Sequence, residues 1–176
     1  MTDFTPADAA RHPEIRLSEP GDHPSDGSQA ARDLHLWMRL ISCCTLIENE
    51  LRSRLRTEFQ TTLPRFELMS QLVQVPRGLK MSELSRRMMV TNGNITGIAD
   101  QLEKDGLVER IKDPADRRSF IIRLTPTGRR HHRRMQRAHE AWVRSLMGGL
   151  PAVTRQTLFE LLGDLKQSTL AVLPVH

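Results

Sequence analysis

Met81-Ser-Glu-Leu-Ser-Arg-Arg-Met-Met-Val-Thr-Asn-Gly-Asn-Ile-Thr-Gly-Ile-Ala-Asp-Gln-Leu-Glu-Lys-Asp-Gly-Leu-Val-Glu-Arg110, with the following Ile111-Lys-Asp-Pro-Ala-Asp-Arg-Arg-Ser-Phe-Ile-Ile-Arg-Leu124, is the stretch that decides the fold. Its apolar spacing predicts a helix over residues 82–89, a tight turn at Met89-Val90 and a second helix from Thr91. Asp105-Gly106 ends that helix, and residues 107–112 and 119–124 read as two strands of a ribbon. This order predicts a winged helix-turn-helix, an arrangement that reads double-stranded DNA.

The second helix of this stretch has one apolar face and one polar face. Its apolar stripe recurs at spacings of three and four and comprises Ile95, Ile98, Ala99 and Leu102. The opposite face carries the short polar side chains of Asn92, Asn94, Thr96 and Gln101. Asn can pair bidentately with adenine edges and Thr can contact a base by its hydroxyl or methyl group, so this face fits a major groove. The hydroxyl of Thr91 is expected to cap the helix.

Two glycines interrupt the polar face, at positions 93 and 97. Each costs roughly 1 kcal/mol of helix propensity relative to Ala, so each needs a reason. One interpretation is close approach of the helix backbone to DNA. The other is close packing against the preceding helix.

The loop between the two strands, residues 113–118, ends in two arginines. An arginine at a hairpin tip can enter the narrow minor groove, where the negative potential is enhanced, and Asp116 can hold an arginine through an ion pair. A solvated hairpin tip is the alternative interpretation of the loop alone. Its position downstream of a recognition helix favours DNA binding.

Several segments together resemble the MarR family of bacterial transcriptional regulators. They are Ser82-Glu-Leu-Ser-Arg-Arg, Gln101-Leu-Glu-Lys-Asp-Gly-Leu-Val-Glu-Arg, Asp113-Pro-Ala-Asp-Arg-Arg and Leu124-Thr-Pro-Thr-Gly. The resemblance covers residues 34–172 and implies a homodimer on a pseudo-palindromic operator, with Arg118 in the minor groove. The candidate DNA contacts are Ser82, Thr91, Asn92, Gly93, Asn94, Thr96, Gly97, Arg110, Lys112, Asp116, Arg117 and Arg118.

The charge of the chain is unevenly distributed. The net charge is +5, yet residues 1–30 hold six acidic and two basic side chains, so the remainder carries +9. A basic body fits a polyanionic partner, because phosphate neutralisation supplies most non-specific DNA affinity. The sequence has no apolar run of about 18 residues and no signal-peptide pattern, which predicts a soluble cytoplasmic protein.

We expect a mainly α fold with a small β-wing, flanked by dimerisation helices. The expected parts are a mobile acidic tail over 1–30, a dimerisation and pocket helix in 31–60, the DNA-binding lobe over 61–124 and C-terminal dimerisation helices over 125–176. The helices themselves are expected at 33–59, from Thr62, at 125–147 and at 153–173. The apolar stripe of the first helix is too long for one small core, so part of it is expected to pack on a partner chain. Thr62 and Thr125 are expected N-caps, each followed by an early proline.

Family members often bind a small molecule between the dimer helices and the DNA-binding lobe. The resemblance implies candidate effector residues at Trp37, Ile41, Cys44, Arg65, Phe66, Met69 and Ser70, although an aromatic and Met set at helical spacing also fits plain core. Three segments look like the branch that regulates aromatic-acid breakdown and responds to hydroxycinnamoyl-CoA thioesters; they begin at Ile41, Thr61 and Met88. The many arginines fit CoA phosphates and DNA equally. The basic run from Arg129 to Arg137 likewise fits DNA phosphates or an anionic ligand.

Other functions find less support in the sequence. Cys43-Cys44 raises an oxidation-sensor hypothesis, but the chain has no Tyr to stabilise a thiolate, so we expect an inert core pair. The histidines at 131, 132 and 139 lack metal-ligand spacing, so no metal or cofactor is expected. No phosphate loop or nucleophile elbow is present, so we do not expect an enzyme. A MarR-type regulator of another phenolic or oxidant signal and a sequence-tolerant architectural DNA-binding protein stay as alternatives.

Overall fold

A computed structural model describes residues 28–113 and 119–173, leaving aside the side chain of Asn92. The chain divides into two units, Met1–Glu50 and Leu51–His176, and each is described by itself. The described residues are mainly helical with a small antiparallel sheet, which confirms the expected fold class. Their elements are α1 (Gln29–Phe59), α2 (Leu63–Val73), β1 (Leu79–Lys80), α3 (Met81–Met88), α4 (Asn92–Lys104), β2 (Val108–Lys112), β3 (Phe120–Leu124), α5 (Pro126–Met147) and α6 (Ala152–Val172). Within the described ranges, no helix is long and apolar enough to cross a membrane.

Helix α1 ends at Phe59 as expected and begins four residues earlier than expected. Only the end of its apolar stripe is buried within the chain, at Leu51 and Leu55. Leu34 and Trp37, earlier in the same stripe, are more than half exposed. The single chain therefore leaves most of this stripe in contact with solvent.

The sheet has three strands, and the expected two-stranded ribbon was therefore incomplete. The strand order is β1-β3-β2, with both neighbours of β3 antiparallel to it. Strand β1 was missed because two residues carry no detectable alternation. Gly78 precedes it with φ +90°, and a Cβ there would lie 2.4 Å from the carbonyl oxygen of Ile122. Only glycine lets the backbone come this close to the central strand.

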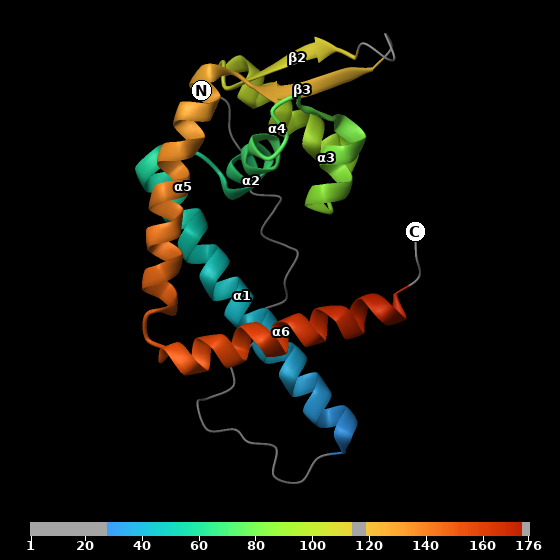
Figure 1. The fold of residues 1–176 in the computed structure, drawn as a ribbon, viewed down its shortest axis with the longest axis vertical. Coiled ribbons are helices and arrows are strands. Elements are labelled where there is room, and N and C mark those ends of the chain that lie inside the picture. Colours follow the sequence, from blue (N-terminus) through green and yellow to red (C-terminus); the bar gives the residue numbers. More distant parts are fainter. Residues whose placement is uncertain (1–27, 114–118, 174–176) are drawn as a thin grey trace, which may run out of the picture. The chain divides into compact units, whose positions relative to one another are not determined.

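The core of the lobe formed by residues 61–124 lies between the sheet and helices α2, α3 and α4, which Figure 1 shows beside the β2–β3 hairpin. Of the four expected inward residues of α4, Ile95, Ala99 and Leu102 are fully buried, whereas Ile98 is half-buried. Along β3 the expected alternation places Ile122 in the core, whereas Phe120 is exposed. Other fully buried side chains of the lobe are Leu68, Met69, Leu72, Leu84, Val108 and Leu124.

Helices α5 and α6 follow the hairpin with the expected bounds to within about one residue. The hydroxyl of Thr125 accepts a hydrogen bond from the backbone N–H of Gly128 at 3.0 Å, as expected for the N-cap of α5. Thr62 occupies the N-cap of α2 but makes no side-chain capping bond, so that expectation was wrong in its detail. None of the residues of helix α6 is buried within the chain. Its exposed large apolar side chains are Val153, Leu158, Phe159, Leu161, Leu162, Leu165, Leu170 and Val172.

Candidate nucleic-acid interface

The outward face of α4 is polar and unobstructed. Asn94, Thr96 and Gln101 are all exposed, while the stripe on the other side of the same helix is buried in the lobe. Burial of the apolar stripe fixes the rotation of the helix about its axis, and this rotation turns the polar side chains towards solvent. Asn94 and Thr96 are therefore both accessible, as expected, but with 3.6 residues per turn they lie about 160° apart around the helix and border the outward face on opposite sides. The side chain of Asn92 lies outside the described residues.

The two glycines of α4 have no packing role among the described residues. A Cβ added at Gly93 or Gly97 would meet nothing within 4 Å. Close packing against the preceding helix is therefore wrong as an explanation. The missing side chains leave the helix backbone bare along the polar face, which lets another surface approach it closely.

Thr91 precedes α4 at the N-cap position, in an extended conformation. Its hydroxyl was expected to accept a hydrogen bond from a backbone N–H of the first turn, but this bond is not formed. The N-cap residue was therefore predicted correctly and its hydrogen bond was not. The first turn instead begins with a backbone bond from Ile95 N–H to the carbonyl oxygen of Thr91. Because Thr91 is exposed, its hydroxyl is accessible to an external acceptor such as a phosphate.

A groove of about 580 Å³ lies where the start of α3, helix α4 and the sheet meet. Three candidate DNA contacts, Ser82, Thr96 and Arg110, line this groove together. Sequence reasoning missed the other lining residues, because they come from three separate elements; they are Lys80, Met81, Ser119 and Phe120. The groove joins the helix-turn-helix to the hairpin in one concave surface.

Arg110 is engaged within the protein. Its guanidinium forms ion pairs with Asp100 and, at 3.3 Å, with Glu103, both on α4. These ion pairs join β2 to α4. To bind a phosphate, Arg110 has to share or exchange these carboxylates, so its contribution is smaller than that of an unpaired arginine.

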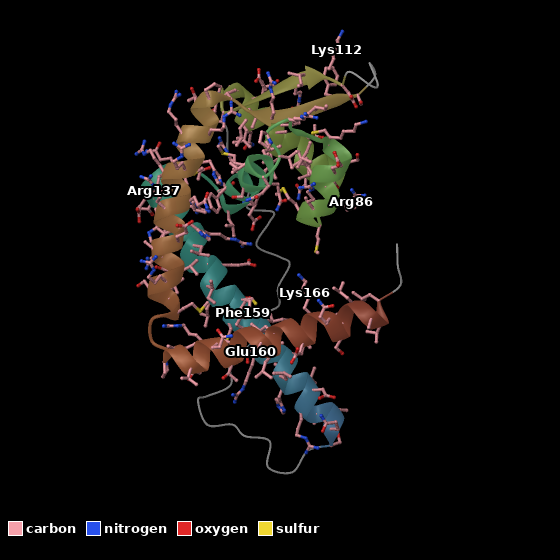
Figure 2. All side chains as sticks on the ribbon, in the orientation of Figure 1. Arg86, Lys112, Arg137, Phe159, Glu160 and Lys166 are labelled. Carbon is pink, nitrogen blue, oxygen red and sulfur yellow. The ribbon has the colours of Figure 1, made fainter. Side chains whose placement is uncertain are left out.

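The base of the hairpin is held by Asp113. This carboxylate is almost fully buried. It forms an ion pair with the ammonium group of Lys80 at 2.7 Å and accepts a hydrogen bond from the hydroxyl of Ser119 at 3.2 Å. Lys112, another candidate DNA contact, is exposed at the end of β2, where Figure 2 shows it on the outer edge of the hairpin. The remaining candidates Asp116, Arg117 and Arg118 lie outside the described residues.

The candidate effector residues on α1 belong to the first unit. Trp37 and Cys44 are exposed and Ile41 is half-buried. Both Cys43 and Cys44 are free and exposed. The expectation that this pair lies in the core is therefore wrong for the single chain, because both thiols are exposed among the described residues.

The candidate effector residues on α2 belong to the second unit and are already occupied by internal contacts. Phe66 and Met69 are buried. Arg65 forms an ion pair with Asp105 at the end of α4, while its buried Nε has no hydrogen-bond partner among the described residues. The hydroxyl of Ser70 donates to the carbonyl oxygen of Phe66 at 2.9 Å.

His132 is a buried polar residue of α5 that the sequence suggested only as a metal ligand, a role that its spacing did not support. Its Nε2 lies 2.8 Å from the hydroxyl of Ser70, and its ring stacks on Phe66 at 5.4 Å between ring centroids. Burial lowers the pKa of His132, and the neighbouring His131 lowers it further. Its spacing of three from Met135 is the signal that could have found it, since it extends the apolar stripe of α5 towards the hairpin.

A smaller pocket of about 130 Å³ lies between the end of α2, β3 and α5. It is lined by Leu72, Val73, Pro76, Leu124, Arg129, His132, Arg133 and Gln136. None of the candidate effector residues lines it. Residues 28–113 and 119–173 contain no cluster of three or more His, Cys, Asp or Glu side chains that could hold a metal ion.

Comparison with known proteins finds similarity to bacterial transcriptional regulators. The sequence profile of the MarR family matches residues 61–120. The transcriptional activatory protein BadR of Rhodopseudomonas palustris is 30% identical over 96 residues, which span 53% of this chain and about half (54%) of BadR. The uncharacterized HTH-type regulator YsmB of Bacillus subtilis is 26% identical over 154 residues, covering 85% of this chain and 98% of YsmB.

Solved structures extend the similarity beyond the lobe. Sco3205, a MarR family transcriptional regulator from Streptomyces coelicolor solved in complex with DNA, superposes with a TM-score of 0.70 at 26% identity. The superposition covers 84% of this chain and 92% of Sco3205. The structural similarity therefore extends along the chain beyond residues 61–124.

Proposed function

We propose that this chain, whose lobe is a winged helix-turn-helix of the MarR family, is a transcriptional repressor that binds a pseudo-palindromic operator as a homodimer. The profile match and the superposition on Sco3205 support a DNA-binding transcriptional regulator of this family. The observation that carries the proposal is the outward face of α4. It is polar, and its two glycines have open space where side chains would be.

The chemistry of this face favours sequence-specific binding over architectural binding. Asn94 and Thr96 are able to reach base edges in a major groove, whereas architectural proteins need only cations and a suitable shape. Cations supply the remaining, sequence-independent affinity, and the body of the chain carries them in excess. In this proposal Arg118 enters the minor groove beside the major groove that receives α4.

The homodimer is supported by the apolar residues that the single chain leaves exposed. Half of α1 and all of α6 present large apolar side chains to solvent, far more than a monomeric protein usually exposes. A C2 dimer that buries them carries two α4 helices, and two such helices about 34 Å apart meet successive turns on one face of DNA.

The effector is proposed to be an aromatic acid or its CoA thioester of the hydroxycinnamoyl type. The resemblance of three segments to the aromatic-acid branch supports this class. The 130 Å³ pocket holds about one benzene ring and is far too small for a CoA thioester, so a thioester needs binding surface outside this pocket. Another phenolic compound or an oxidant is the alternative, and the exposure of Cys43 and Cys44 favours testing peroxide beside the acids.

The experiment begins by selecting duplexes from a random pool with the full-length protein and comparing the selected duplex with its scrambled version in gel-shift titrations. We expect a preference of at least a hundred-fold for a selected pseudo-palindrome, bound by two chains. Equal affinity for both duplexes, with a steep salt dependence, supports the architectural alternative instead. Release is then measured with p-coumarate, p-coumaroyl-CoA, free CoA and peroxide. Free CoA is the matched control for the thioester.

A further inference from the structure

Lys80 occupies a helix position at which lysine is unfavourable. It is the N-cap residue of α3, a position that prefers Ser, Thr, Asp or Asn, and its cation lies near the positive end of the helix dipole. An ammonium group cannot accept hydrogen bonds from the free amides of the first turn. Glu83 does accept a bond from the backbone N–H of Lys80 at 3.1 Å, but that bond does not require a lysine. The side chain therefore points to a role elsewhere in the fold.

That role involves Asp113 at the base of the hairpin. The Nζ atom of Lys80 lies 2.7 Å from Oδ2 of Asp113, whose side chain is only 6% exposed. A buried carboxylate is tolerated only when it is paired and hydrogen-bonded. Ser119 supplies the hydrogen bonds, because its hydroxyl donates to the carboxylate and its carbonyl oxygen accepts from the backbone N–H of Asp113.

The Lys80–Asp113 ion pair links two parts of the fold that lie far apart in sequence. Lys80 pairs with Ile121 in the sheet and immediately precedes α3, whereas Asp113 follows β2. The pair thus joins the start of the helix-turn-helix to the base of the β2–β3 hairpin. Lys80 and Ser119 also line the groove that contains Ser82, Thr96 and Arg110.

We propose that Lys80 is a positioning residue for DNA binding, whose ion pair with Asp113 fixes the angle between the β2–β3 hairpin and helix α3. The hairpin and α4 then reach neighbouring grooves of one duplex without further ordering. This inference rests on the proposed function. Its energetic basis is preorganisation, since a hairpin that has to be oriented during binding reduces affinity for the site that needs both contacts. Random DNA, which is held mainly by charge, depends less on this angle.

A direct phosphate contact by Lys80 makes different predictions. A phosphate-binding lysine supports binding to every sequence and adds about one to the salt slope. It also gains nothing from Asp113, because a neighbouring carboxylate weakens its attraction to phosphate. A positioning residue, in contrast, needs its carboxylate partner as much as its own charge.

The test uses full-length protein in five forms, namely wild type, Lys80→Met, Asp113→Asn, the double variant and Lys80→Arg. Lys104→Met, which removes an exposed cation at the end of α4 outside the groove, is the matched control. Each form is titrated on the selected operator and on its scrambled version across a salt series. Circular dichroism and melting temperature show that the fold is retained. If Lys80→Met does not fold because Asp113 is left uncompensated, Asp113→Asn and the double variant still decide the question.

We expect Lys80→Met and Asp113→Asn each to lower operator affinity about ten-fold with less than three-fold loss on scrambled DNA. The double variant should be no worse than either single variant, because both changes break one interaction. Lys80→Arg should bind like wild type. Asp113→Asn at wild-type operator affinity, or equal losses on both duplexes with a shallower salt slope for Lys80→Met, overturns the inference and leaves the proposed function intact. A wild-type protein that selects no sequence rejects the proposed function itself.

Discussion

The hydroxyl oxygen of Ser70 on α2 lies 2.8 Å from Nε2 of His132 on α5. The single proton of Ser70 is directed to the carbonyl oxygen of Phe66, so the Nε2–H of His132 donates to the serine oxygen. This bond fixes the tautomer of a buried imidazole in the contact between α2 and α5. Because α5 continues directly from the hairpin and α2 packs against α4, a change at this contact reaches the DNA-binding lobe.

This arrangement predicts that acid destabilises the protein. Burial lowers the pKa values of His131, His132 and His139 below their usual 6.5. Arg134 and Arg65 lower that of His131 further, whereas Asp105 opposes the shift, and Glu140 opposes that of His139. The native state therefore holds these rings neutral, and the unfolded chain binds more protons below about pH 6.5. Stability contributed by the neutral rings is present above this pH and is lost as the pH falls.

The measurement is the melting temperature between pH 7.5 and pH 5.5, at constant ionic strength. We expect it to fall with pH, and to fall less in His132→Gln, which has no imidazole to protonate at the buried position. His35→Gln, at an exposed position on α1, is the control and should keep the wild-type pH dependence. An identical slope in wild type and His132→Gln would show that His132 contributes nothing to it.

Alanine at Gly93 or Gly97 is predicted to stabilise the free protein while weakening DNA binding. Nothing lies within 4 Å of the added methyl group, so the usual helix gain of about 0.5–1 kcal/mol for Gly→Ala applies. The same methyl group obstructs a close approach of DNA to α4. Denaturant unfolding and gel-shift titration measure the two effects. Gly149→Ala, which also has open space but lies after α5, should leave DNA binding unchanged. Unimpaired operator binding by both α4 variants would argue that α4 does not enter a groove.

Replacement of Asn94 by Ala is predicted to relax base preference more than it weakens overall binding. Asn94 is exposed on the outward face of α4 and makes no contact that stabilises the fold in the described residues. Loss of a bidentate base contact costs about 1–3 kcal/mol on the operator and little on random DNA. Titration of operator and scrambled duplexes gives the ratio. A proportional loss on both would exclude a base contact at this position.

Replacement of Arg118 by Ala is predicted to weaken operator binding by about 2–4 kcal/mol per dimer, because two minor-groove arginines are lost together. The melting temperature should stay within about a degree or two of wild type. Arg144→Ala removes a cation from the exposed last turn of α5 and is the control for charge alone. Wild-type operator affinity of the Arg118 variant would mean that the hairpin does not reach the minor groove in this way.

The sequence by itself determined the helix-turn-helix and the strands that follow it. The apolar spacing of Ile95, Ala99 and Leu102 is a local property of one helix, and their full burial shows that it was sufficient. The cap at Thr125 was predictable for the same reason, since its acceptor and donor lie within one turn. Local patterns also left a polar face on α4, because only one side of that helix is needed for the core.

Only the tertiary structure decided which residues meet across the elements. Ser70 and His132 are 62 positions apart. Two helices and a strand, α3, α4 and β2, lie between Lys80 and Asp113 along the chain. Strand β1 exists because β3 offers it a free edge, and two residues show no period of their own. The sequence offered Arg110 as a candidate DNA contact, and the fold pairs it with Asp100 and Glu103 of α4. Such contacts depend on how whole helices and strands pack together, so residue spacing along the chain does not predict them.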